Sequence, residues 1–77
     1  MSRTHFPSQA IVDTIKREYP TGTRVVLDHM NDPYSNLPSG LKGVVTGVDD
    51  IGTIFVRWEN GSRLGVVLGE DICHKIT

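Results

Sequence analysis

Cysteine, aromatic residues and long apolar runs are all scarce in this sequence. Cys73 is the single cysteine, so no disulfide can form within the chain, and a reducing compartment fits better than secretion. The first residues lack the apolar segment of a signal peptide, and no apolar run approaches the length that spans a bilayer. We therefore expect a cytoplasmic protein with no membrane partner.

A strong excess of charge of either sign is also missing. Eight Lys and Arg residues against nine Asp and Glu residues give a formal net charge of -1 and a pI near 6.2. The summed field offers no long-range attraction to phosphate backbones or anionic lipids, so any nucleic-acid interpretation requires a local basic patch. At 77 residues there is room for a single domain, residues 1–77, with a small core.

Residue types that serve catalysis or bind metals are present without the required arrangements. The segment Gly40-Leu41-Lys42-Gly43 lacks the spacing and the following helix of a phosphate-binding loop. No G-x-S-x-G nucleophile motif occurs, and adjacent acidic pairs fall in expected turns. The soft metal ligands share no finger-like spacing: His5, His29, Cys73 and His74. We expect no enzymatic activity, no metal and no cofactor.

One amphipathic helix is predicted over residues 7–19. Ile11, Ile15 and Tyr19 recur at helical spacing, with charged residues between them. Pro20 disfavours helical geometry at the residue before it, so the helix should end there.

From residue 21 onward, β-branched residues and spaced glycines predict short strands separated by turns. We place five strands, at residues 23–29, 42–48, 53–58, 62–68 and 72–76. The expected fold class is mainly β: a small, strongly bent, five-stranded antiparallel barrel over about residues 21–77, preceded by one N-terminal α-helix.

Two three-residue loops are predicted, Asp50-Ile51-Gly52 and Glu59-Asn60-Gly61, each ending in a left-handed glycine. This loop length sets Val48 opposite Ile54 and Trp58 opposite Ser62, which keeps apolar residues on one face. The predicted inner face consists of Val44, Thr46, Val48, Ile54, Val56, Trp58, Leu64, Val66 and Leu68.

The same register places Phe55 on the opposite face, between Gly47 and Gly65 on the neighbouring strands. Glycine within a strand often marks bending or the close approach of another element. We favour the helix as the cover for an outer apolar patch of Phe55, Val45 and Val67, since small monomers avoid exposed apolar patches. An exposed ligand platform is the alternative.

The long connection from Asp28 to Leu41 is the first candidate binding segment. Its Met30, Tyr34 and Leu37 carry more apolar bulk than a flexible linker, and long loops in compact domains are commonly functional. We expect the loop to fold back over a barrel end and to bind a protein partner.

Two facing arginines on the outer face are the second candidate. The register sets Arg57 opposite Arg63 and beside Phe55. Nearby carboxylates, Glu59 or Asp49, are the favoured balancing groups, since like charges opposite each other are usually neutralised. The alternative is a nucleotide or nucleic acid, with arginine holding phosphate and the aromatic ring stacking on a base.

Several motifs occur together in an order that resembles a known family. They are Tyr19-Pro20-Thr21-Gly22-Thr23-Arg24-Val25, Met30-Asn31-Asp32-Pro33-Tyr34, Leu37-Pro38-Ser39-Gly40, Gly43-Val44-Val45, Val48-Asp49-Asp50-Ile51-Gly52, Trp58-Glu59-Asn60-Gly61, Leu64 and Gly69-Glu70-Asp71. They resemble a small domain family of unknown function from short proteins of Gram-positive bacteria, phages and conjugative elements. The resemblance implies an SH3-like barrel and carries over no catalytic or ligand-binding residues.

Two functional hypotheses follow. The first is a non-enzymatic SH3-like interaction module, associated with a phage or mobile element, that binds a protein partner through Met30, Tyr34 and Leu37. The alternative is nucleotide or nucleic-acid binding, for example capture of a host signalling nucleotide in counter-defence, through Arg57, Arg63 and Phe55. A hydrolase ranks below both, and the sequence leaves the oligomeric state open.

Overall fold

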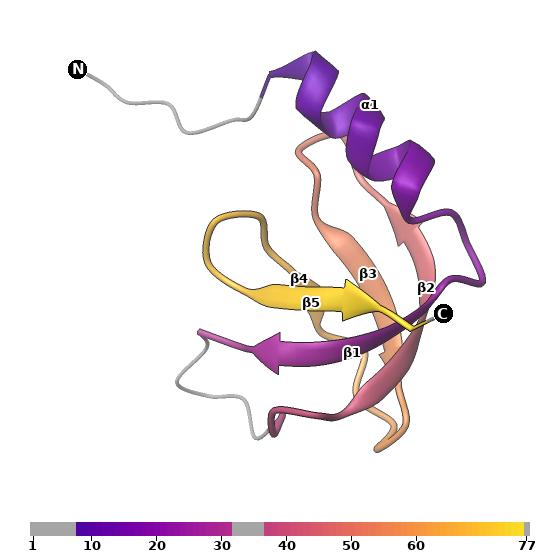
Figure 1. Cartoon of the computed structure of the whole chain (residues 1–77), viewed down its shortest axis with the longest axis vertical. Helices are drawn as coiled ribbons and strands as arrows, with labels where there is room; N and C mark the ends of the chain where they lie inside the picture. The colour runs from indigo at the N-terminus through magenta and orange to yellow at the C-terminus, as the bar shows by residue number, and fades with distance from the viewer. Residues whose placement is uncertain (1–7, 32–36, 77) are drawn as a thin grey trace.

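One helix and five strands form the described part of the chain, residues 8–31 and 37–76 of a computed structural model (Figure 1). Every paired strand runs antiparallel to its neighbour. The elements are α1 (Gln9–Glu18), β1 (Arg24–His29), β2 (Lys42–Val48), β3 (Ile54–Trp58), β4 (Gly65–Val66) and β5 (Ile72–Lys75).

Helix α1 begins after Ser8, whose side-chain oxygen accepts a hydrogen bond from the Ile11 amide at 3.3 Å. It ends at Tyr19, whose backbone angles, φ -125° and ψ 59°, are no longer those of a helix. The prediction that Ile11 belongs to the packed face of the helix is wrong, because Ile11 is 48% exposed and Val12 is 1% exposed. The face of α1 that packs against the rest of the domain therefore consists of Val12, Ile15 and Tyr19. In the described part of the chain, no helix is long and apolar enough to cross a membrane.

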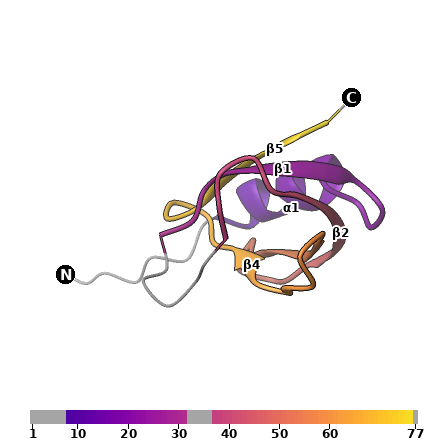
Figure 2. The same cartoon turned by 90° about the horizontal axis from the view of Figure 1, so that it is seen from below.

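The five strands form one sheet in the order β4-β3-β2-β1-β5. The predicted mainly β fold of five antiparallel strands and one helix is confirmed. The sheet bends strongly but remains open, with β4 and β5 as its two edges (Figure 2).

The predicted fourth strand, residues 62–68, is mostly irregular, because only Gly65–Val66 are in a strand. The Trp58 indole Nε1 donates a hydrogen bond to the Leu64 carbonyl at 2.9 Å, and the chain turns again immediately after Val66. Leu68, which we expected to face inward, is 45% exposed in that turn.

Both predicted three-residue turns are present. Gly52 and Gly61 adopt φ values of 82° and 90°, the left-handed region that glycine enters without steric cost. The Gly61 amide donates to the Trp58 carbonyl at 3.0 Å. In the other turn, the Asp49 carboxylate accepts the amides of Ile51 and Thr53, at 3.0 and 2.9 Å.

Strand β2 contains a β-bulge between Val45 and Gly47 that the sequence did not predict. Val48 pairs with Ile54 as expected, but on the other side of the bulge Val45 pairs with Val56. The predicted inward orientation of Val44 and Thr46 is therefore wrong.

The close approach of Trp58 to Gly43 explains the register on that side of the bulge. An added Cβ at Gly43 would lie 2.5 Å from Val56 Cγ1 and 2.8 Å from Trp58 Cε3, so only glycine fits beneath the indole. The bulge thus leaves Lys42 and Val44 on the outer side of β2. The buried core consists of Val25, Leu27, Val45, Ile54, Val56, Trp58 and Val66.

Asp71 links two segments across the open side of the sheet. This side chain is buried, and its two carboxylate oxygens accept the Asn31 amide at 2.8 Å and the Val67 amide at 2.9 Å. One carboxylate therefore joins the segment after β1 to the segment after β4, two strands that no ladder pairs with each other.

Candidate anion-binding site

In the loop predicted to bind a protein partner, the described apolar side chains pack against the core. Met30 and Leu37 are half-buried and contact the core cluster. Tyr34 lies outside the described residues. These two side chains therefore contribute to packing of the core, and the binding role predicted for the loop stays a prediction.

Phe55 lies on the outer side of β3, paired with Gly47 on one side and Gly65 on the other, as the sequence predicted. Helix α1 does not cover it: the Phe55 side chain is 41% exposed. The expected outer patch is also wrong in its composition, because Val45 is fully buried in the core.

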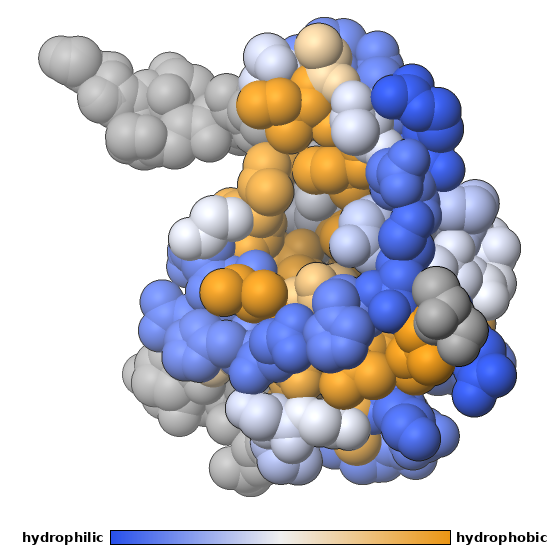
Figure 3. Space-filling model, in the orientation of Figure 1, coloured by the Kyte–Doolittle hydropathy of each residue, from blue (hydrophilic) through white to orange (hydrophobic). Residues whose placement is uncertain are grey.

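The helix fails to reach Phe55 because it packs over the open, inner side of the sheet. There Ile15 and Tyr19 border a hollow of about 160 Å³ that also touches Ile54, Leu68 and Ile72. Figure 3 shows apolar side chains gathered in this gap between α1 and β5. We call it the helix hollow.

The outer face carries a larger hollow of about 400 Å³. Four cationic side chains border it, and we call it the basic hollow: Arg24, Lys42, Arg57 and Arg63. Val44 and Trp58 add apolar surface, and Glu59 is the one carboxylate-bearing residue among the described residues that line it.

The strand register brings these cations together from distant parts of the sequence. Arg24 on β1 pairs with Val44 on β2, and Val44 pairs with Arg57 on β3, so the three lie in one row across the sheet. Neighbouring strands are about 4.8 Å apart, which sets Arg24 and Arg57 about 10 Å apart along this row. Lys42 lies in the adjacent row, where its carbonyl accepts the Glu59 amide at 2.9 Å.

Within residues 8–31 and 37–76, the four cations have no ion-pair partner. Elsewhere in the described chain, Lys16 and Lys75 form ion pairs with carboxylates, and Arg17 donates to a threonine hydroxyl. None of the four side chains at the basic hollow forms an ion pair with a carboxylate of the described residues. All four are exposed to solvent.

Our expectation that Glu59 or Asp49 balances the arginines is therefore not met among the described residues. Asp49 instead caps its own turn by accepting two backbone amides. Glu59 lines the basic hollow but lies within 4.0 Å of no cationic nitrogen of the described chain.

Sequence reasoning found Arg57 and Arg63 but missed Arg24 and Lys42. Arg24 could not be found from the predicted register, because that register turns Val44 inward, whereas in the structure Val44 faces outward and is flanked by Arg24 and Arg57. Lys42 could not be found either, because the register predicted for β2 contains no bulge and turns this side chain toward the core. The bulge turns it outward.

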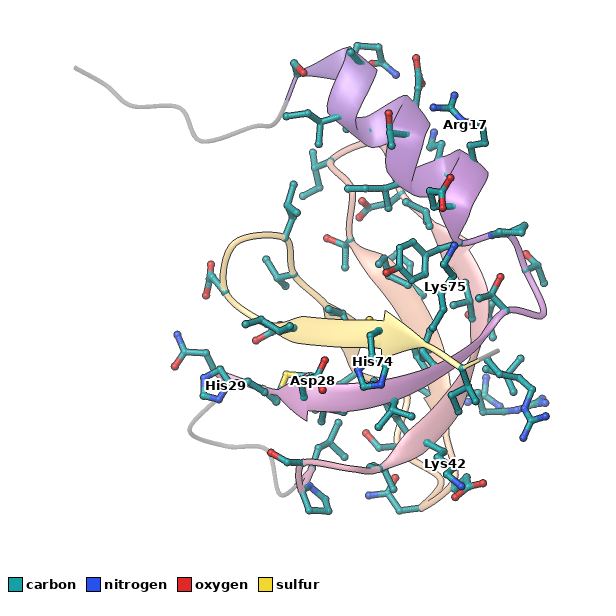
Figure 4. The ribbon with its side chains drawn as sticks, viewed as in Figure 1. Arg17, Asp28, His29, Lys42, His74 and Lys75 are labelled. Atoms are coloured by element: carbon teal, nitrogen blue, oxygen red, sulfur yellow. The ribbon has the colours of Figure 1, made fainter. Side chains whose placement is uncertain are left out.

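The thiol and imidazole groups lie outside the basic hollow. The His74 Nδ1 lies 2.8 Å from a carboxylate oxygen of Asp28, and Figure 4 shows the two side chains facing each other across β5 and β1. Burial, followed by the Asp28 charge, raises the pKa of Cys73 to about 11, which keeps the thiol protonated at neutral pH. His5 lies outside the described residues, and residues 8–31 and 37–76 contain no cluster of three potential metal ligands.

The chemistry available at the basic hollow is the binding of anions. Guanidinium groups present several N–H donors in a fixed plane and form charge-assisted hydrogen bonds with phosphate or carboxylate oxygens. The exposed ring of Phe55 lies on the same side of β3 as Arg57, two residues away.

Comparison with known proteins identifies the family. Neither the curated proteins nor the solved structures contain a match to this chain. A family model described as "Domain of unknown function (DUF4314)" matches residues 8–76, which include every helix and strand described above. The predicted membership of a small domain family of unknown function is thus confirmed, and the chain belongs to the DUF4314 family.

Proposed function

We propose that this domain is a non-enzymatic binding module that holds a phosphate-bearing ligand at the basic hollow. The observation that carries this proposal is the gathering of Arg24, Lys42, Arg57 and Arg63 around one hollow without an ion pair in the described chain. We also propose that the bent, open sheet is a variant of the SH3-like barrel, supported by its five short antiparallel strands and tight turns.

Electrostatics supports an external anion over an internal explanation. Like charges on adjacent strands repel each other, and proteins usually place carboxylates nearby to balance them. This chain has nine acidic residues, yet only Glu59 among the described ones lines the hollow. A phosphate group would balance the cluster and accept several charge-assisted hydrogen bonds at once.

A labelled abasic oligodeoxynucleotide, a phosphodiester chain without bases, tests this proposal by fluorescence anisotropy. We expect binding at low salt that weakens roughly tenfold or more in the double variant Arg57→Gln, Arg63→Gln, since hydrogen bonds to charged groups contribute about 1.5–3 kcal/mol each. A matched double variant on α1, Lys16→Gln and Arg17→Gln, should bind like the wild type. Figure 4 shows Arg17 and Lys42 at opposite ends of the molecule.

An acidic protein surface is the competing class of ligand, and polyglutamate provides the corresponding probe. We expect polyglutamate to bind more weakly than the abasic strand at equal charge, because phosphate offers more acceptor oxygens per group. Absence of abasic-strand binding at low salt, or an undiminished affinity in the Arg57→Gln, Arg63→Gln variant, would refute the proposal.

Protein binding remains a second candidate, now favoured by the helix hollow and not by the Met30 loop. Leu68 and Ile72 border this hollow and are 45% and 59% exposed, which is unusual for large apolar side chains next to one another on a small domain. A pull-down from host lysate with wild type and with a Leu68→Gln, Ile72→Gln variant tests it. Equal capture by the two proteins would exclude this surface.

A further inference from the structure

A second hollow is bordered by Phe55, which lies two residues from Arg57 on the same side of β3. It measures about 330 Å³ and is bordered by Met30, Phe55, Leu64 and Val67, and we call it the Phe55 hollow. Residues that border the two hollows are close neighbours in the chain, because Phe55 and Arg57 lie two residues apart on one side of β3 and Leu64 follows Arg63. A ligand held by the arginines therefore meets an apolar surface directly beside them.

The ring of Phe55 is supported on one side and open on the other. An added Cβ at Gly65 would lie 3.3 Å from Phe55 Cδ1 and 2.7 Å from Thr53 Cγ2, so the ring rests against the bare backbone of Gly65. At Gly47, on the other side, an added Cβ would meet no heavy atom within 4 Å. The aromatic surface toward Gly47 is thus free to contact a ligand.

The width of the cationic row indicates how many phosphates the ligand carries. Arg24 and Arg57 are two strand spacings apart, about 10 Å, and Arg63 lies beyond Arg57 in the segment that leads into β4. Four cations and one carboxylate give the basic hollow a formal charge of about +3, more than a single phosphate group of about -1.5 to -2 balances. Several phosphates in succession match it better than a mononucleotide does.

We propose that the ligand is a single-stranded nucleic acid, with successive phosphates in the basic hollow and a base stacked on the face of the Phe55 ring that points toward Gly47. This inference rests on the proposed function, because it assigns the polymer to which the phosphates belong. A single strand presents phosphates and unpaired bases side by side, whereas the bases of a duplex are stacked on one another and unavailable to the ring.

Four labelled oligonucleotides of equal length separate the contributions: a mixed-sequence DNA strand, its RNA equivalent, the DNA duplex and the abasic strand. We expect the single strands to bind about tenfold more tightly than the abasic strand, as one stacked base provides. The duplex should bind more weakly than its single strand. The logarithm of the binding constant should fall linearly as the logarithm of the salt concentration rises. The slope should be no steeper than about -2.8, the value for four phosphate contacts with a single strand.

Phe55→Leu is the diagnostic variant, since it keeps an apolar side chain and removes the aromatic face. It should lower single-strand affinity to the level of the abasic strand and leave abasic-strand affinity unchanged. Ile51→Ala, which alters another exposed apolar side chain, should behave as wild type. As a measurement that needs no variant, photocrosslinking of a 5-iodouracil strand to the wild-type protein should modify Phe55.

The outcomes distinguish this inference from the proposed function. Equal binding of base-containing and abasic strands, with no effect of Phe55→Leu and no crosslink at Phe55, would overturn the inference and leave phosphate binding intact. Tighter binding of the duplex than of the single strand would also overturn it. No binding of any strand at low salt would overturn both.

Discussion

The charged residues near α1 and those around the basic hollow are all exposed to solvent but differently arranged. Near the helix, the Lys16 Nζ lies 3.0 Å from an Asp50 carboxylate oxygen, and the Lys75 Nζ lies 2.8 Å from a Glu18 carboxylate oxygen. Both pairs connect α1 to the sheet. At the basic hollow, the cations have no such partner in the described chain. Ion pairing thus occurs where it holds the helix in place, and folding alone does not account for the cationic cluster.

The largest effect is expected from Gly43→Ala, which removes the sheet geometry on which the basic hollow depends. The new Cβ would overlap Val56 Cγ1 and Trp58 Cε3, and overpacking of this kind costs about 1–3 kcal/mol of unfolding free energy. Urea denaturation followed by Trp58 fluorescence measures the loss. Gly47→Ala is the control, because its Cβ would enter open space. Equal destabilisation by both substitutions would contradict the proposed packing of Trp58.

The affinity for the abasic strand tests the role of Glu59, the one carboxylate-bearing residue among the described residues that line the basic hollow. Glu59→Gln should raise the affinity for the abasic strand by about threefold, since one nearby charge contributes on the order of 1 kcal/mol or less in a solvated site. Asp13→Gln, on the exposed helix surface, serves as the control. Weaker binding by Glu59→Gln would show that this carboxylate supports the arginines.

Removal of a charge should affect stability in opposite directions in the two regions. Arg57→Gln should raise the free energy of unfolding by a few tenths of a kcal/mol, roughly, because it relieves repulsion between like charges on neighbouring strands. Glu18→Gln should lower it, because the partner of Lys75 is lost. Thermal unfolding at low salt compares the two variants. A loss of stability in both would mean that Arg57 has a structural partner after all.

The smallest effect is a pH dependence at the helix. The hydrogen bond from Lys75, together with its charge, lowers the pKa of Glu18 from its ordinary value of 4.5, and the same bond raises the pKa of Lys75 from 10.5. The stability from this pair is therefore complete between these two pH values. It declines as pH falls below 4.5 and as pH rises above 10.5. The difference in unfolding free energy between wild type and Glu18→Gln should shrink at both extremes, and a constant difference would contradict the assignment.

The turns and the central strand could be predicted because their signals are local. Gly52 and Gly61 occupy loops of a length that keeps Ile54 and Trp58 on one face, and the structure has both. The bulge in β2 could not be predicted, since Val44 and Val45 are both apolar and either could face inward. The space beneath Trp58 decides between them, which only the packed structure reveals.

The candidate site could be predicted only in part, because only some of its residues are brought together by local structure. Arg57 and Arg63 follow from one hairpin, so their proximity is visible in the sequence. Lys42 depends on the bulge, and Arg24 on the pairing of β1 with β2 across a long connection. The position of α1 also escaped prediction, because an amphipathic helix indicates that it has an apolar face but not which side of a sheet it covers.

The two hydrogen bonds accepted by Asp71 have a consequence for the internal motions of the domain. Because this one side chain accepts both bonds, its displacement breaks them together and releases the segments after β1 and β4, which no strand ladder joins. Transient opening at this place should expose the Asn31 and Val67 amides together. These two amides, far apart in sequence, should exchange their hydrogens with solvent at matching protection factors, and Asp71→Asn should lower both.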